Sequence, residues 1–187
     1  MDPSNVTLNR TYNLSVWLAK EASSLLEVYS DLQGFSDPPP GLPASKLQLP
    51  VAPDEDWDHA RRLGHRRAAC LHLAARLRQV LGEQRELNET RHHLHQQLQF
   101  AITGLEGLVA NLGLILSSLG SPAQGGGAAE GGEEEDGGNH GSPSPTPGMT
   151  HWEAKVKGYH IIAHYSNWIS RMVEDLERLK DNLEPEA

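Results

Sequence analysis

The sequence predicts an all-α protein, a long-chain four-helix bundle whose helices run up-up-down-down. Two observations predict it. Four blocks of the chain carry apolar residues at steps of three and four, which places these residues on one face of a helix in each block. The connections after the first and third blocks are long, and the connection after the second is short. Long connections suit crossovers between parallel neighbours, and short ones join antiparallel neighbours.

The first helix is expected at about residues 12–33. Its apolar stripe comprises Leu14, Leu18, Ala22, Leu25, Tyr29 and Leu32. Gly34 is expected to end it, and the prolines that follow cannot continue a helix because proline lacks an N–H and fixes φ. A long overhand connection therefore leads to the second helix.

The second helix is expected at about 55–81, with Asp54 or Asp56 at its start because acidic residues suit a helix N-terminus. Its stripe comprises Trp57, Ala60, Leu63, Cys70, Leu73, Leu77 and Leu81, and its opposite face carries Arg61, Arg62, Arg66, Arg67, Arg76 and Arg78. We interpret that face as solvated, with binding of a heparin-like polyanion as the alternative. Cys70, the lone cysteine, excludes an intramolecular disulfide and is expected to be an inert buried thiol.

The third helix is expected at about 90–119, after a break between Gly82 and Asn88. It carries the clearest stripe of the chain: Leu94, Leu98, Ile102, Leu105, Val109, Leu112, Leu116 and Leu119. Its glycines lower its intrinsic helix propensity, so packing must supply its stability.

Residues 120–150 are expected to form a disordered acidic loop rich in glycine and proline. The segment has no Lys or Arg and holds five acidic residues of a chain whose net charge is -9. We expect residues 122–148 to be dispensable for folding, because the free energy of closing a loop changes slowly with its length.

The fourth helix is expected at about 151–183. Thr150 is a suitable N-cap, and Glu153 stands at the position that completes a capping box. The stripe comprises Trp152, Val156, Tyr159, Ile162, Ile169, Met172, Val173, Leu176 and Leu179. Residues 1–187 are thus read as one domain.

The residues do not form a pattern typical of an enzyme. His160 and His164 lie at i, i+4 spacing but lack the Glu of an HExxH zinc site, so we expect the histidines to have solvated or packing roles. We predict no catalytic residue, metal or cofactor. The negative charge argues against nucleic acid or an anionic membrane surface as the main partner.

Four sequons, at Asn5, Asn9, Asn13 and Asn88, are typical of a secreted chain. The first residues have no signal-peptide pattern, and no stretch is expected to be long and apolar enough to span a bilayer. We therefore expect an extracellular protein that is exported without a leader or whose leader is missing, with a cytoplasmic pool as a possibility left open. The alternative is an intracellular helical scaffold or adaptor that binds other helices.

Several segments resemble the ciliary neurotrophic factor, cardiotrophin and cardiotrophin-like subfamily of interleukin-6-type cytokines. The residues that carry the resemblance are Val16-Trp17-Leu18-Ala19-Lys20, Glu27-Val28-Tyr29, Gln33-Gly34, Pro50-Val51-Ala52, Asp56-Trp57, Lys155-Val156-Lys157-Gly158-Tyr159, Asn167-Trp168, Arg171 and Asp175-Leu176. They occur in the order and at the separations found in that family. The resemblance implies a secreted, monomeric growth factor that supports neurons and signals through JAK/STAT.

The resemblance also implies three receptor-binding surfaces. The surface for an alpha receptor, such as ciliary neurotrophic factor receptor alpha, would include Trp57, Asn167 and Arg171, and the alternative role for Trp57 is a buried anchor of the long connection. The surface for glycoprotein 130 would lie on the first and third helices, with Lys20, Ser24, Asp31, His92, Gln96, Gln99 and Thr103. The surface for the leukaemia inhibitory factor receptor would comprise Trp152 and Lys155, where family members have Phe-x-x-Lys, and the alternative is that Trp152 covers the end of the core. Trp17 is expected at the edge of the core, and Trp168 either in the core or at a surface.

Overall fold

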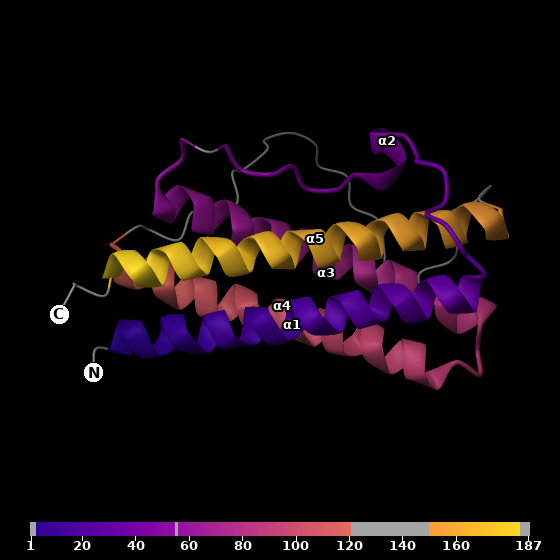
Figure 1. Ribbon diagram of the computed structural model, residues 1–187, viewed down its shortest axis with the longest axis horizontal. Coiled ribbons are helices and arrows are strands. Elements are labelled where there is room, and N and C mark those ends of the chain that lie inside the picture. Colours follow the sequence, from indigo (N-terminus) through magenta and orange to yellow (C-terminus); the bar gives the residue numbers. More distant parts are fainter. Residues whose placement is uncertain (1–2, 55, 121–149, 184–187) are drawn as a thin grey trace, which may run out of the picture.

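A computed structural model describes residues 3–54, 56–120 and 150–183, and these residues form an all-α bundle (Figure 1). The helices are α1 (Pro3–Gln33), α2 (Ala44–Leu47), α3 (His59–Leu87), α4 (His92–Ser118) and α5 (His151–Leu183). The long helices α1 and α3 run in one direction, and α4 and α5 run in the other (Figure 1). Both α1 and α3 pack against α4 and α5. The predicted up-up-down-down four-helix bundle is therefore confirmed.

The core lies between the four long helices, and each contributes one stripe. Leu18, Leu73, Leu98 and Ile162, one from each helix, are fully buried or nearly so. Not every expected stripe residue is buried: Leu14, Val109 and Val173, all in mid-helix, are only half-buried because they lie at the edges of their stripes. Leu119, expected in the core, is 37% exposed because it is the C-cap residue that follows the last turn of α4.

The start of α1 corrects the expected boundary at residue 12, because the helix begins at Pro3. Proline suits the first turn of a helix, where its missing N–H has no partner to lose. The buried face continues back through Ser15 and Thr11 to Leu8. The hydroxyls of Thr11 and Ser15 donate to backbone carbonyls of their own helix at 2.7 Å, so these polar residues can be buried at little cost.

The second and third helices also differ from the expected bounds of 55–81 and 90–119. Helix α3 begins at His59, and its N-cap is Asp58, whose carboxylate accepts from the backbone N–H of Arg61 at 2.7 Å. The helix passes through Gly82 to Leu87, since Val80 and the fully buried Gln84 extend its inner face. Helix α4 then spans His92–Ser118.

The start of α5 agrees with the predicted capping box. The N–H of Glu153 donates to the hydroxyl oxygen of Thr150 at 3.1 Å, and the N–H of Thr150 donates to the carboxylate of Glu153 at 3.0 Å. The bond from the Thr150 N–H, together with the nearby Lys46 ammonium, lowers the pKa of the Glu153 carboxyl. The acidic loop expected at 120–150 falls almost wholly on 121–149, outside the described residues.

One expectation about α4 was wrong. This helix is long and apolar enough to cross a membrane by length and composition. Most of its apolar residues nevertheless belong to the core stripe of the bundle, and its outward face carries exposed polar residues such as Gln96, Gln99 and Glu106 beside the exposed Phe100 and Leu114. A buried core helix passes the same test, so the finding is weak support for a membrane span.

The arginine-rich face of α3 is largely occupied by contacts within the bundle, which corrects its interpretation as a solvated face. Arg66 is 3% exposed, and its Nε lies 2.8 Å from the carboxylate of Asp175. Arg67 donates to a backbone carbonyl of α4, and Arg78 pairs with Glu106. These contacts do not favour the polyanion alternative. Cys70 is fully buried, which raises the pKa of its thiol to about 12 and keeps it unreactive.

Candidate partner-binding surfaces

The first candidate surface is centred on Trp57, which lies half-buried where the long connection meets α3. The guanidinium of Arg61 lies 4.1 Å from the centre of the Trp57 ring. The His65 ring meets the indole edge-to-face, with centroids 5.3 Å apart. Asn167 and Arg171 are exposed on α5.

Trp168 is the residue of α5 to which Trp57 is linked through His65. It is 3% exposed, so of the two roles left open for Trp168 the structure supports the core role. His65 lies against it at a centroid distance of 5.9 Å, and His164 stacks on it at 5.8 Å. Trp57 therefore reaches α5 through His65 and Trp168, and Asn167 adjoins Trp168 along the helix.

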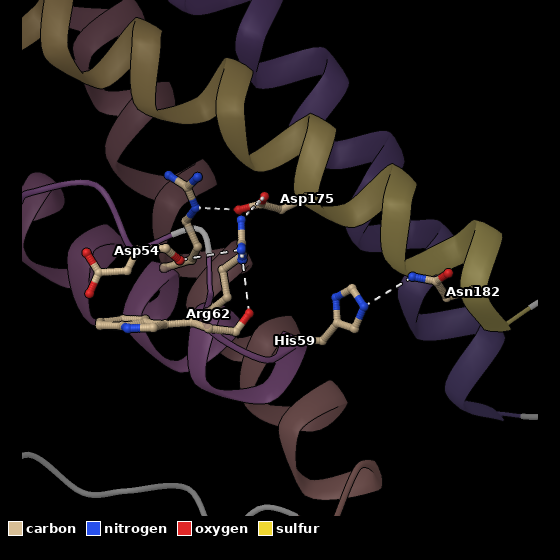
Figure 2. Close-up of polar contacts among 7 residues, drawn as sticks. Asp54, His59, Arg62, Asp175 and Asn182 are labelled. Carbon is tan, nitrogen blue, oxygen red and sulfur yellow. Dashed lines mark hydrogen bonds and ion pairs between the residues drawn. The ribbon is translucent and has the colours of Figure 1, made fainter.

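The side chain of Arg62 links the residues around Asp54 and Trp57 to α5 (Figure 2). Its guanidinium lies 3.4 Å from the carboxylate of Asp175, which is also paired with Arg66. The other end of the Arg62 guanidinium donates to the backbone carbonyls of Asp54 and Trp57 at 3.4 and 3.5 Å. The position of Trp57 thus depends on ion pairs between α3 and α5.

The second candidate surface lies on the outward faces of α1 and α4. Lys20 and Asp31 are exposed on α1, and the expected polar residues His92, Gln96, Gln99 and Thr103 are exposed on α4. Ser24, which was expected on the same exposed face, is half-buried, and its hydroxyl oxygen accepts from the side-chain amide of Gln97 at 3.4 Å. The two helices approach closely nearby, where a Cβ added at Gly104 would overlap the side chain of Leu18.

Two aromatic residues add to this surface. Trp17, expected at the edge of the core, is 46% exposed because it precedes the buried Leu18 and lies about 100° round the helix from it. Phe100 is 60% exposed and was not singled out from the sequence. The sequence does contain a signal for it, since Phe100 is an aromatic residue outside the apolar stripe and follows Gln99 on a polar face.

The third candidate surface lies at the other end of α5, in its first turns. Trp152 is 55% exposed and contacts Phe35 edge-to-face at a centroid distance of 5.6 Å. Phe35 also meets Tyr159 at 5.7 Å. Trp152 is therefore placed by aromatic contacts on one side and exposed on the other.

The end of α1 explains how Phe35 reaches α5. Gly34 has φ of +76°, and the backbone N–H groups of Gly34 and Phe35 donate to the carbonyls of Asp31 and Ser30. This is the Schellman arrangement, which favours glycine at the left-handed position. It directs Phe35 toward Trp152.

Lys155 is held through its backbone, while its side chain is partly exposed. The hydroxyl of the fully buried Tyr29 donates to the Lys155 carbonyl at 3.0 Å and accepts from the Gln84 amide at 3.3 Å. Burial raises the pKa of Tyr29, so it remains a neutral donor. Gly158 leaves the space for this hydroxyl. The Trp152 and Lys155 pair is thus attached to α1 and α3 by specific contacts.

The sequons lie mostly within helices. Asn5, Asn9 and Asn13 follow one another at intervals of four along α1, and Asn13 is exposed while the other two are half-buried. Asn88 caps α3, and its side-chain nitrogen donates to Gln84 at 2.9 Å. Asn13 is therefore the most accessible of the four in the folded chain.

Comparison with known proteins identifies relatives of the whole bundle. The model of the LIF / OSM family matches residues 12–176. Cardiotrophin-2 of Mus musculus is 31% identical over 183 residues, which cover 92% of this chain and 83% of that protein. Cardiotrophin-1 of Mus musculus is 33% identical over 177 residues, covering 92% of this chain and 84% of that protein. Cardiotrophin-2 of Pan troglodytes is 30% identical over 181 residues, covering 92% of this chain and 83% of that protein.

Proposed function

We propose a receptor-assembling function for this chain on one premise: it belongs to the LIF / OSM family and is a cytokine of the interleukin-6 type. Proteins of this family are signalling ligands and not enzymes. Our proposal is that the chain acts outside the cell as a monomeric, neurotrophic growth factor. It brings an alpha receptor, glycoprotein 130 and the leukaemia inhibitory factor receptor together and so activates JAK/STAT signalling.

The observation that carries the proposal is the exposed Trp152 on the capped start of α5. A large aromatic side chain that is 55% exposed, yet placed by Phe35, is typical of an anchor for a partner pocket. Lys155 lies three residues later, which places its ammonium on the same helix face. We assign this pair to the leukaemia inhibitory factor receptor. The change from Phe to Trp at this position alters the shape of the anchor.

The first surface is assigned to the alpha receptor. Trp57 offers a half-buried indole edge with the Arg61 cation against its face, and Trp and Arg are the residue types in which binding energy concentrates. Exposed Asn167 and Arg171 extend this surface along α5.

The second surface is assigned to glycoprotein 130. Lys20 and Asp31 supply charges on α1, and we add Trp17 and Phe100 as apolar anchors. Glycan at Asn13, one helical turn before Trp17, would border this surface in the secreted protein.

Separate surfaces on one rigid bundle explain how a small ligand holds several receptors. Once one receptor is bound, encounter with the next becomes effectively intramolecular, so weak contacts suffice. The polar contacts that link α1, α3 and α5 beneath Trp152 keep that surface fixed relative to the rest of the bundle.

The test is binding of the purified chain to each of the three receptor ectodomains, immobilised separately. We expect Trp57→Ala to weaken only the alpha receptor, and Trp17→Ala combined with Phe100→Ala to weaken only glycoprotein 130. The double variant Trp152→Ala, Lys155→Ala should weaken only the leukaemia inhibitory factor receptor. If the chain binds none of the three ectodomains, alone or mixed, the proposal is wrong.

A further inference from the structure

The long connection between α1 and α3 is held by side chains of other helices. Its prolines have no N–H, so its backbone carbonyls cannot all be paired within the segment. Three histidines make polar contacts to its backbone instead. His160 contacts the carbonyl of Pro40, His72 that of Gln48 and His65 that of Val51.

His65 differs from the other two because it also touches Trp57. Its Nε2 lies 2.7 Å from the carbonyl oxygen of Val51, and its ring meets the indole of Trp57 at 87°. On another side the ring lies against the buried Trp168. One half-buried side chain therefore joins the connection, the exposed surface and the core.

The side chain of Val51 does not provide this anchorage. Val51 is 78% exposed, so the segment before Trp57 is not held at this point by apolar burial. The side-chain contacts that hold its backbone include the bond from His65 and the donation from Arg62 to Asp54 and Trp57. Among these residues, His65 alone both holds the backbone and packs against the indole.

We propose that His65 is a positioning residue for the first receptor-binding surface. By holding the Val51 carbonyl and packing against the indole, it keeps Trp57 in the orientation that the alpha receptor binds. The inference rests on the proposed function of this surface, and the position of Trp57 is measurable without any receptor.

Two variants separate the contacts of His65. His65→Phe keeps an aromatic ring and removes the donor to Val51, whereas His65→Gln keeps an N–H donor and removes the ring. The matched control is His72→Phe, which removes a similar contact at Gln48 at a residue with no ring contact to Trp57 in the described chain.

Amide hydrogen exchange at residues 51–57 reports on the position of this segment, and binding to the immobilised alpha-receptor ectodomain reports on function. We expect both His65 variants to exchange faster there and to bind about tenfold more weakly, mainly through faster dissociation. Binding at the other two surfaces should be unchanged in both His65 variants. The His72→Phe control should match the unmodified chain in amide exchange at residues 51–57 and in binding to the alpha-receptor ectodomain.

Unchanged exchange at residues 51–57 in both variants would overturn the inference. Equal losses at all three surfaces would overturn it too, because the effect would then be general unfolding. Faster exchange with undiminished binding would leave His65 as a positioning residue and remove Trp57 from the receptor surface.

Discussion

Replacing Trp152 and Lys155 by alanine tests whether the third surface is a binding anchor or a cover for the core. Complete removal of a buried aromatic side chain costs about 3–5 kcal/mol of unfolding free energy. Trp152 is 55% exposed, so less than half of that, about 1–2 kcal/mol, is expected, mostly from its contact with Phe35. For a chain of this length the melting temperature should fall by only about 2–8 °C.

The effect on binding should be much larger. Loss of an anchor costs about 2–4 kcal/mol of binding free energy, and with loss of the ammonium we expect affinity for the leukaemia inhibitory factor receptor ectodomain to fall about 100- to 1,000-fold. Surface plasmon resonance, at a temperature below the melting temperature, measures this affinity. Leu71→Ala is the matched control, since Leu71 is 51% exposed on α3 and outside the three surfaces. A double variant that melts several degrees earlier yet binds fully would show that Trp152 belongs to the core.

Two further predictions concern stability. Gly158→Ala gains about 1 kcal/mol of helix propensity, but the added Cβ would overlap the Tyr29 hydroxyl, so we expect a net loss of about 2 kcal/mol in urea unfolding. Gly64→Ala, where the Cβ meets nothing, should instead gain about 0.5–1 kcal/mol, and a loss there would contradict the packing. The second prediction concerns pH. Burial lowers the pKa of His164 in the folded chain, so its stabilising effect is present above the unfolded pKa and is lost as pH falls below it. The melting temperature should therefore drop between about pH 7.5 and about pH 5.5, and His164→Gln should reduce this drop while His93→Gln, on an exposed residue, should not.

The sequence predicted the helices well where an apolar stripe is continuous. In α4, residues from Leu94 to Leu116 repeat at helical spacing, and the helix differs from expectation by only a few residues. In α1 the stripe is interrupted just before residue 12 by Thr11, whose burial depends on a hydroxyl bond that no hydropathy pattern reveals. The earlier part of that helix was missed for this reason.

The candidate sites were less predictable because they depend on contacts between helices. The placement of Trp152 depends on its contact with Phe35, which follows Gly34 and lies more than a hundred residues away in the chain. The burial of Arg66 follows from its pairing with Asp175 of α5. A single-helix pattern treats Arg66 as solvated, since it contains no information about the carboxylate on the neighbouring helix.

The most direct test of the central claim is the mass of the complex that the chain forms with soluble ectodomains of the three receptors. At nanomolar concentrations, mass photometry should detect one assembly that contains the chain and all three ectodomains. The Trp152→Ala, Lys155→Ala variant should give an assembly that lacks only the leukaemia inhibitory factor receptor. A mixture in which the folded, unmodified chain leaves all three ectodomains separate would contradict the account.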